Sequence, residues 1–389
     1  MIEGLNPRLV FAIAFVTGIL AVLYIDRNKI ERHSILFIRR TQRGIDLLDR
    51  IAKKAPRFWN IYGWTGVFFA LLSIPLMVFQ MGWIVNNFIK TGSSEGGPSA
   101  ILPGLTSDTT VTGNLEAGVT FIPVEYWVIS IAIIMVVHEA SHGIIARMEG
   151  FEINSVGWLV LGIIPGAFVE PKGMQLGEEE DGEGLGAAEI WDQGNYKQRL
   201  KVLAAGSWAN YITAAVFGLG YLALIGFILP TFFSGAVQYN AIEGYPAAEA
   251  GMNSGTINTI NGQNITSAQE IQSVLNGTSP GDSISISTSE GDFQFELGER
   301  EGFETGFIGI NFSYPYYITW FVNLFSMIAF LNLAIGMFNM LPAKPLDGGH
   351  ILDTLVEGFG TEEQRVYVNY FSVLMWIIVL GSLITALVL

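Results

Sequence analysis

Apolar stretches separated by short polar segments dominate this sequence. Six of them approach or exceed the length of about 17–25 residues that a helix needs to cross a bilayer. They cover residues 9–25, 61–89, 124–148, 202–229, 318–341 and 366–389. Pro75 interrupts the second stretch. The pattern predicts a multi-pass α-helical membrane protein with about six transmembrane helices.

The first apolar stretch has the length of a secretory signal peptide as well as that of an anchor. A signal peptide begins with positive charge and ends with small residues at a cleavage site. Here Glu3 and Arg8 cancel before the stretch, and Asp26-Arg27-Asn28-Lys29 follows it. We therefore expect an uncleaved anchor helix whose N-terminus lies outside the cell.

Residues 27–57 carry ten of the twenty lysines and arginines of the chain. The positive-inside rule places such a segment in the cytoplasm. Apolar side chains recur in it at roughly helical spacing, at Ile35, Ile38, Ile45, Leu48 and Ile51. This spacing predicts a basic amphipathic helix on the inner leaflet, with a solvated helix as the alternative.

Residues 157–169 are apolar but too short to cross a bilayer, and glycine and proline interrupt them. A segment of this length is often re-entrant or interfacial. Irregular backbone at membrane depth is tolerated where it is buried in protein or lines a cavity. We expect either a re-entrant segment whose edge pairs with an extended substrate or an ordinary buried loop.

Residues 234–315 have the composition of a soluble domain, with ten acidic residues and one basic residue, Arg300. A helix at residues 267–275 begins with the capping pattern Ser267-x-x-Glu270. The predicted strands cover residues 256–260, 283–288 and 293–297. The Asn-x-Ser/Thr sequences of the chain also fall here, at Asn264, Asn276 and Asn311. The segment is predicted to be a small α/β domain outside the membrane.

The composition limits the chemistry that this chain can perform. Of its 389 residues, 50% are hydrophobic and only 14% are charged, which is typical of a membrane protein. The absence of cysteine excludes disulfides and thiolate zinc sites. There are four histidines, His33, His138, His142 and His350, so a carboxylate is favoured as the third ligand of any metal. The net charge of −15 argues against nucleic acid as a partner.

The third apolar stretch contains His138, Glu139 and His142 in the order H-E-x-x-H. Two histidines four positions apart lie on one face of a helix and can bind a single metal ion. Glu139 is then free to take a proton from a metal-bound water. A charge in a bilayer costs about 2.5–3.5 kcal/mol or more, so such residues usually serve a function. The alternative is a chance pair of core histidines.

A second polar group follows the fifth apolar stretch. Residues 339–350 read NMLPAKPLDGGH, and Asp347 lies at the end of an apolar helix. The count of spans places Asp347 on the cytoplasmic side, at the level of His138, which makes a shared site the favoured interpretation. Gly206 and Asn210 lie one turn apart in the fourth stretch. Helix packing is expected for Gly206, and either packing or a role in the site for Asn210.

These motifs resemble those of a known family. HEASH on a membrane helix, with LDGG near the inner end of a later helix, is similar to the site-2 protease family of intramembrane zinc metalloproteases. The inserted segment resembles a PDZ domain, in Tyr245-Pro-Ala-Ala-Glu-Ala-Gly251, Ile260-Asn-Gly-Gln263 and Pro280-Gly-Asp282. The resemblance begins at about Trp127 and reaches the C-terminus, so the first 120 residues lie outside it.

The resemblance implies a role for each residue of the motifs. His138, His142 and Asp347 would bind zinc, and Glu139 would be the catalytic acid and base. Asn339 matches an asparagine of the family that is thought to contact substrate, and Asn210 is a second candidate for substrate binding. The chain would hydrolyse peptide bonds within transmembrane segments of membrane proteins, which are its expected partners together with the lipid bilayer.

The apolar stretches, the positive-inside rule and the resemblance together predict a division of the chain and a location in the cell membrane. The expected parts are an anchor helix and basic segment (1–58), a second helix and external loop (59–121), the two halves of the catalytic core (122–233 and 316–389) and the PDZ-like domain (234–315). The active site is expected toward the cytoplasm. The PDZ-like domain is expected outside, where it could exclude substrates with bulky external parts or bind a partner.

Other functions remain open at this point. A catalytically idle relative could bind membrane proteins through the PDZ-like domain. A transporter with a metal in its pathway would show internal repeats, which the sequence lacks. A different H-E-x-x-H membrane peptidase would use a downstream glutamate as third ligand, for which Glu357 and Glu362 are candidates.

Overall fold

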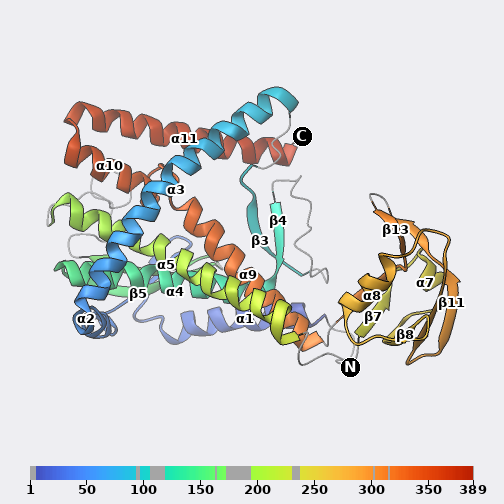
Figure 1. Ribbon diagram of the computed structural model, residues 1–389. Coiled ribbons are helices and arrows are strands. Elements are labelled where there is room, and N and C mark those ends of the chain that lie inside the picture. The colour runs from blue at the N-terminus through green and yellow to red at the C-terminus, as the bar shows by residue number, and fades with distance from the viewer. Residues whose placement is uncertain are drawn as a thin grey trace. The chain divides into compact units, whose positions relative to one another are not determined.

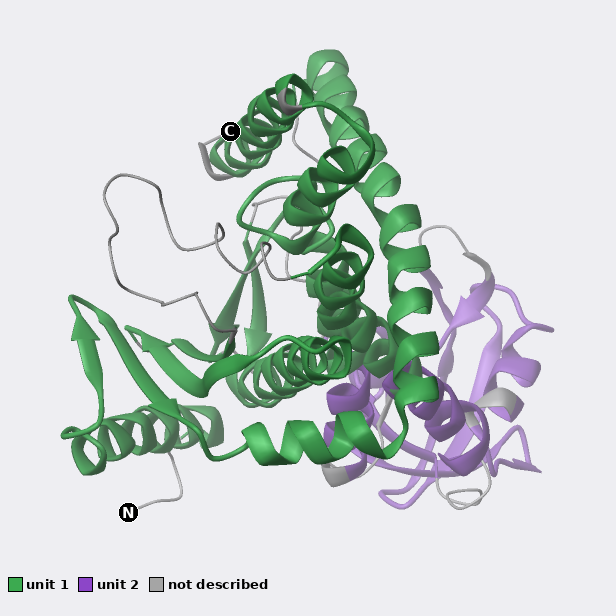
Figure 2. Ribbon diagram, turned by 90° about the vertical axis from the view of Figure 1, so that its left-hand side faces the viewer, with its two compact units in different colours: residues 1–216, 327–389 green, residues 217–326 purple. Residues whose placement is uncertain are grey.

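The computed structural model describes residues 6–92, 97–105, 119–162, 164–171, 194–229, 237–300, 303–313 and 316–388. The chain separates into two compact units (Figure 2). Unit 1 consists of Met1–Val216 and Met327–Leu389, and unit 2 consists of Phe217–Ser326. Unit 2 is thus wider than the predicted insertion, because it includes the ends of the two helices that lead into and out of it.

Six helices in the described part of the chain are long and apolar enough to cross a membrane. They are α1 (Pro7–Ile25), α3 (Pro56–Thr91), α4 (Val124–Glu149), α5 (Tyr196–Ala223, extended by a π-helical turn at Leu224–Ile228), α9 (Tyr316–Phe338) and α11 (Glu362–Val388) (Figure 1). Their number matches the hydropathy pattern. Pro75 lies inside a continuous α3 rather than interrupting it, since a membrane helix tolerates the loss of one backbone hydrogen bond.

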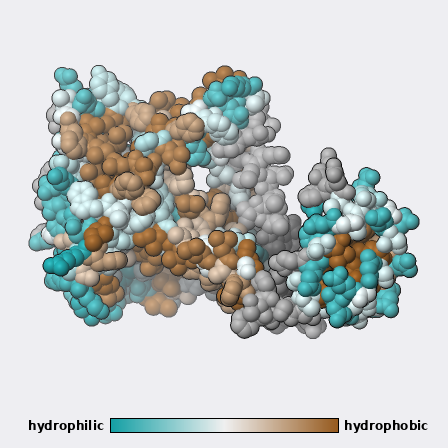
Figure 3. All heavy atoms as spheres, in the orientation of Figure 1, coloured by the Kyte–Doolittle hydropathy of each residue, from teal (hydrophilic) through white to brown (hydrophobic). Residues whose placement is uncertain are grey.

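The surface of unit 1 agrees with these assignments. In Figure 3 hydrophobic residues cover most of the long helices, and hydrophilic residues gather at the end where α2 and the start of α5 lie. Hydrophilic and neutral residues predominate over the described part of residues 237–313, the α/β part of unit 2. The chain is accordingly a multi-pass helical membrane protein with a polar unit inserted between its fourth and fifth long helices.

One buried cluster joins α3 to the later helices of unit 1. Its members come from α3, α5, α11, the loop after α9 and the helix α10 (Asp347–Phe359), and they include Val67, Ala70, Met77, Met81, Leu200, Leu203, Ala204, Met340, Leu341, Ala343, Ile351, Met375 and Val379. Side chains of α3 therefore pack directly on the elements that carry the polar motifs. Helix α3, which the family resemblance does not cover, is part of the same core.

The basic segment after α1 differs from its prediction. It forms strands β1 (Glu31–His33) and β2 (Leu36–Thr41) before the short helix α2 (Ile45–Lys54). Ile38, expected on a helix, is fully buried in β2 and lies opposite Leu159 of another strand. The expected single amphipathic helix is therefore wrong, because pairing with a distant strand overrides the local helical spacing.

The short apolar segment after α4 is an antiparallel hairpin of β5 (Ile153–Leu161) and β6 (Ile164–Pro171). It belongs to a four-stranded sheet with the order β1-β2-β5-β6, so β6 is an edge strand among the residues that the structure describes. Gly143 of α4 allows this strand to approach, since a Cβ there would lie 3.3 Å from the Val169 side chain. The segment is thus a strand edge beside the H-E-x-x-H helix, rather than a buried loop.

The remaining elements of unit 1 are short. The parallel strands β3 (Ala100–Gly104) and β4 (Val119–Pro123) precede α4, in the segment predicted as an external loop. Residues 93–96 and 106–118 of that segment lie outside the described residues. Helix α10 (Asp347–Phe359) follows α9 and leads to α11.

Unit 2 is a small α/β fold around a sheet with the order β11-β10-β8-β7-β14, with β9 paired to β8. Its elements are β7 (Val237–Ala241), α7 (Pro246–Glu249), β8 (Ser254–Ile260), β9 (Gln263–Asn264), α8 (Ala268–Leu275), β10 (Ser283–Thr288), β11 (Asp292–Glu296), β12 (Gly298–Arg300), β13 (Phe303–Phe307) and β14 (Ile310–Ser313). The predicted strands and helix agree with β8, β10, β11 and α8. Positive φ angles at Asn261 and Gly262 form the turn after β8, and Ser267 caps α8 by accepting the N–H of Glu270.

Candidate metal centre

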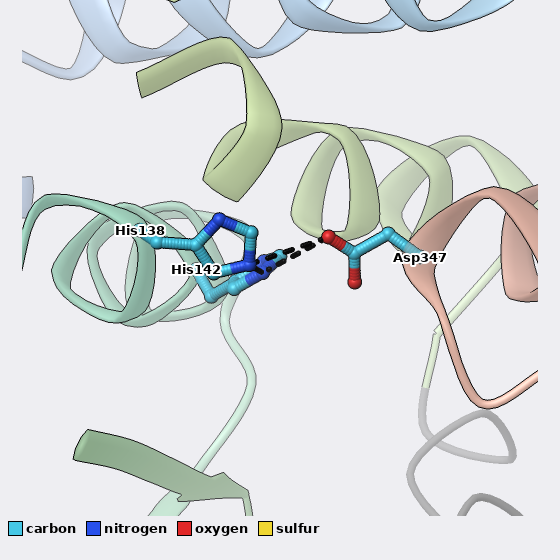
Figure 4. A group of neighbouring side chains, drawn as sticks. All are labelled: His138, His142 and Asp347. Carbon is cyan, nitrogen blue, oxygen red and sulfur yellow. Dashed lines mark hydrogen bonds and ion pairs between the residues drawn. The ribbon is translucent and has the colours of Figure 1, made fainter. Parts of the chain in front are cut away.

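His138 and His142 lie on one face of α4 and turn their rings toward each other. Their Nε2 atoms are 3.0 Å apart, and the two rings are nearly perpendicular (Figure 4). His138 is buried and His142 is half-buried. The spacing of four residues places both nitrogens at one point, as the helical period requires.

Helix α5 determines which nitrogen of each ring is available. The Nδ1 atom of His142 lies 2.7 Å from the carbonyl oxygen of Val202, so Nδ1 carries the proton and donates it. The Nδ1 atom of His138 lies 3.1 Å from the side-chain amide of the fully buried Asn210. Rotating the side-chain amide of Asn210 by 180° exchanges its nitrogen and oxygen. The oxygen then faces His138 and accepts the proton of Nδ1. Both Nε2 atoms are thereby left as lone-pair donors.

Asp347 completes the group from a different helix. It is the first residue of α10, and its Oδ2 atom lies 3.4 Å from Nε2 of His138 and 3.6 Å from Nε2 of His142. A carboxylate oxygen that faces two imidazole nitrogens completes a set of ligands that zinc accepts, and it would act as the anionic ligand.

The glycines of LDGG bring Asp347 into place. A Cβ on Gly348 would lie 2.4 Å from the Met340 backbone, and one on Gly349 would lie 2.4 Å from the Lys344 nitrogen. The N–H of Gly348 donates to the carbonyl oxygen of Asn339, 2.7 Å away. Only glycine allows α10 to start this close to the end of α9. The close approach fixes where the Asp347 side chain begins.

The three side chains fit a zinc ion. Zinc ligands at about 2.0–2.1 Å from the ion in tetrahedral geometry lie roughly 3.3 Å from one another. The observed separations are 3.0, 3.4 and 3.6 Å. Two unprotonated nitrogens facing each other at 3.0 Å repel unless a cation lies between them. Asp347 Oδ2 is buried and accepts no hydrogen bond, which also favours a cation there.

Among the described residues, His138, His142 and Asp347 form the one group of this kind. Glu357, a rival third ligand, instead pairs with Arg199. The side chain of Glu362, the other rival, lies outside the described residues. The donor set is therefore two imidazoles and one carboxylate.

Gly206 lies directly against the ligand atoms. A Cβ at this position of α5 would be 2.3 Å from Nε2 of His142 and 2.7 Å from Nε2 of His138. The sequence favours a packing role for this glycine, but the structure places it where any side chain would fill the metal position. The spacing in the sequence offered one indication of this role. Gly206 lies one turn before Asn210 and so on the same face of α5, and Asn210 contacts Nδ1 of His138.

Glu139 follows His138 in α4 and contacts the edge strand β6. Its Oε2 accepts the N–H of Val169 in β6 at 3.3 Å. Glu139 does not belong to the three-ligand group. A carboxylate beside the ligands, held by a backbone N–H, is placed to exchange protons rather than to bind metal.

Tyr62 lies beside the site, although the sequence does not indicate it. Tyr62 of α3 contacts Ser141, inside HEASH, at 2.7 Å between hydroxyl oxygens, and its hydroxyl lies 3.4 Å from the carbonyl oxygen of Ala205. It thus links three helices beside the site, and no local motif signals it. The half-buried side chain of Asn339 makes no hydrogen bond with any described residue, so its contact with substrate stays a prediction.

Comparison with known proteins is consistent with this site. The family model for Peptidase family M50 matches residues 126–380. A protein of Methanocaldococcus jannaschii described as uncharacterized is 25% identical over 97% of this chain and 98% of its own length. A protein of Helicobacter pylori named "Putative zinc metalloprotease" is 32% identical over 38% of this chain and 45% of its own length. Residues 126–380, which the family model matches, contain the three ligands and Glu139.

Proposed function

This chain belongs to peptidase family M50, the site-2 protease family, and we propose that it is an intramembrane zinc metalloendopeptidase. Its substrates would be peptide bonds within transmembrane segments of other membrane proteins. The observation that carries the proposal is the convergence of His138, His142 and Asp347 beside a free strand edge. Two of these ligands lie on a helix long and apolar enough to cross a membrane.

The ligand residues fit the chemistry of peptide hydrolysis. A bound zinc ion would lower the pKa of its water to about 7 and polarise the scissile carbonyl. Val202 and Asn210 orient the two imidazoles toward that position. Gly206 leaves the space open for the ion. The donor set, its orientation and its free volume all support the same role.

Glu139 would act as general base and then as general acid. It is the one carboxylate of the H-E-x-x-H motif, and a backbone N–H already orients it. In this role it takes the proton of the attacking water and delivers it to the leaving amine. The Val169 N–H holds the carboxylate in place and is itself part of the proposed substrate-facing strand.

The edge strand β6 would hold the substrate. A membrane helix satisfies its own backbone hydrogen bonds, so it must unwind before its carbonyl reaches the ligands. The N–H of Val169 donates to Glu139, so by the alternation of an antiparallel ladder the backbone groups of Val169, Ala167 and Pro165 point away from β5. Proline at an outward position fits an edge, where it leaves no ladder bond unmade. An unwound substrate would add there as an extended strand.

The proposed arrangement places the chain in the cell membrane with its active site toward the cytoplasm. The basic residues between α1 and α3 support this orientation through the positive-inside rule. Unit 2 would then lie outside and, if it acts as a PDZ-like domain, would exclude substrates with bulky external parts. Cysteines introduced at Arg43 and at Gln272 should be labelled from opposite sides of the membrane. Labelling from the same side contradicts this orientation.

Metal analysis tests the proposed chemistry. Purified wild-type protein should contain one zinc ion per chain, and Asp347→Ala should lose it, because a catalytic site has only three protein ligands to hold the ion. Retention of zinc by Asp347→Ala at the wild-type level would mean that another residue is the third ligand. Glu357→Ala is the matched control and should keep its zinc.

A further inference from the structure

Glu170 is a carboxylate that the proposed chemistry does not use. It lies in the edge strand β6 and is fully buried. Its predecessor in the chain is Val169, whose N–H holds Glu139. A buried carboxylate is retained only where charged or hydrogen-bonding partners compensate for its desolvation. Its partners therefore indicate what this end of β6 is attached to.

The main partner of Glu170 comes from the N-terminal segment. Nε of Arg40 in β2 lies 3.3 Å from Oε1 and 3.2 Å from Oε2, and Nη2 lies 3.3 Å from Oε1. Ser155 Oγ donates to Oε2 at 2.5 Å, and Asn154 Nδ2 contacts Oε2 at 3.5 Å. Arg40 also pairs with Glu31 of β1. The guanidinium thus joins β1, β2 and β6, although β2 and β6 are separated by β5.

The strand register shows how one side chain spans the sheet. Arg40 lies opposite Gly157 of β5, and Gly157 lies opposite Phe168 of β6. Residues directly opposite each other share a face, and so do residues two apart in one strand. Arg40, Phe168 and Glu170 therefore share one face of the sheet, and Val169 lies on the other, toward α4. The ion pair crosses the sheet on the face away from Glu139.

The backbone ladder is irregular where the ion pair lies. The pairing of β5 with β6 shifts register between Ile153 and Ser155, opposite the end of β6 that contains Glu170. A register shift leaves residues unpaired and loosens the local ladder. Among the described strands, β6 has no partner on its other side. The ion pair and hydrogen bonds of Glu170 therefore hold this end of β6, where the backbone pairing is irregular.

We propose that the Arg40–Glu170 pair positions the end of the edge strand β6, and with it Glu139 and the substrate strand. Arg40 and Glu170 are positioning residues in this inference, because neither touches the metal group. The inference rests on the proposed function, since it assigns β6 to substrate binding. It also makes the N-terminal strands, which precede the matched peptidase region, a component of the substrate site.

The test compares full-length variants on a synthetic membrane helix. Arg40→Met alone leaves a buried carboxylate unpaired and risks misfolding. The double variant Arg40→Met/Glu170→Gln removes both charges and keeps a hydrogen-bonding side chain for Ser155. We expect it to keep its zinc, to lose roughly 10–100-fold in kcat/KM mainly through KM, and to cleave at several neighbouring bonds. Arg39→Met is the matched control, because Arg39 pairs with Asp26 and not with β6.

Wild-type kcat/KM and a single unchanged cleavage position in the double variant would overturn the inference. Amide hydrogen exchange at Val169 gives a readout that needs no substrate. It should be at least about tenfold faster in the double variant than in wild type or Arg39→Met, because opening of the strand end becomes easier. Unchanged exchange would also overturn the inference. If the wild-type protein cleaves no membrane helix, the proposed function is contradicted instead. Amide hydrogen exchange at Val169 then still tests whether the Arg40–Glu170 pair positions β6.

Discussion

The Nδ1 atom of His142 lies 2.7 Å from the carbonyl oxygen of Val202. This contact ties a ligand on α4 to the backbone of α5, four residues before Gly206 on the same face of that helix. One helix therefore orients the ligand through a carbonyl and leaves space for the metal through a glycine. The metal centre depends on the distance between α4 and α5 as much as on the H-E-x-x-H motif.

Replacing Gly206 should remove the metal without removing a ligand. In Gly206→Ala the new Cβ would lie 2.3 Å from Nε2 of His142, so either the ring or the helix must move. Zinc content should fall by at least about tenfold, in the range seen when residues around metal ligands change. Gly82→Ala is the control, since a Cβ there meets no atom within 4 Å. Full zinc occupancy in Gly206→Ala would contradict the assigned geometry.

Asn210 should act through His138 rather than through the substrate. Asn210→Ala removes the partner of the Nδ1 atom of His138, and zinc affinity should fall by about 10–100-fold. Excess zinc should then restore most of the activity, with KM for the substrate unchanged. A raised KM with normal zinc affinity would support the substrate-binding role predicted from the sequence.

Acid should weaken the ion pairs of Asp353 in α10, one of which holds Lys344 in the loop before Asp347. Burial raises the pKa of Asp353, but Arg365 and Lys344 outweigh burial and hold it below its usual value. A depressed pKa stabilises the folded state above the unfolded value of about 3.9, and this contribution is lost as the pH falls through the folded value.

Thermal unfolding of wild type and Asp353→Asn between neutral pH and pH 3 measures this effect. The variant should unfold at a lower temperature at neutral pH, and the two curves should converge below about pH 4. A constant difference at every pH would show that the charge of Asp353 is not responsible. The same loop is held through Lys344, whose N–H donates to Ser372 at 2.7 Å.

The sequence predicts the parts of this fold that depend on local spacing. Six apolar stretches become six long helices, and the interval of four residues brings His138 and His142 together. Counting spans predicts Asp347 at the level of His138, and the structure brings their side chains within 3.4 Å. These features need only helical periodicity and length, so no tertiary information is required.

Features that depend on distant contacts could not be predicted in this way. Ile38 has a spacing that fits a helix, but β2 pairs with β5 more than a hundred residues later. Gly206 looks the same in sequence whether it faces another helix or a metal. Tyr62 reaches Ser141 from a helix that the family resemblance does not cover. Each of these positions takes its role from elements that only folding brings together.

The role of Glu139 tests the central claim most directly. Glu139→Gln keeps the size of the side chain and all three ligands but removes the proton acceptor. Zinc content should match wild type, and cleavage of a synthetic membrane helix should fall by about 10²–10⁴-fold or more. His138→Ala, as a control, should lose zinc and activity together. If Glu139→Gln retains zinc and cleaves at the wild-type rate, the proposed protease mechanism is wrong.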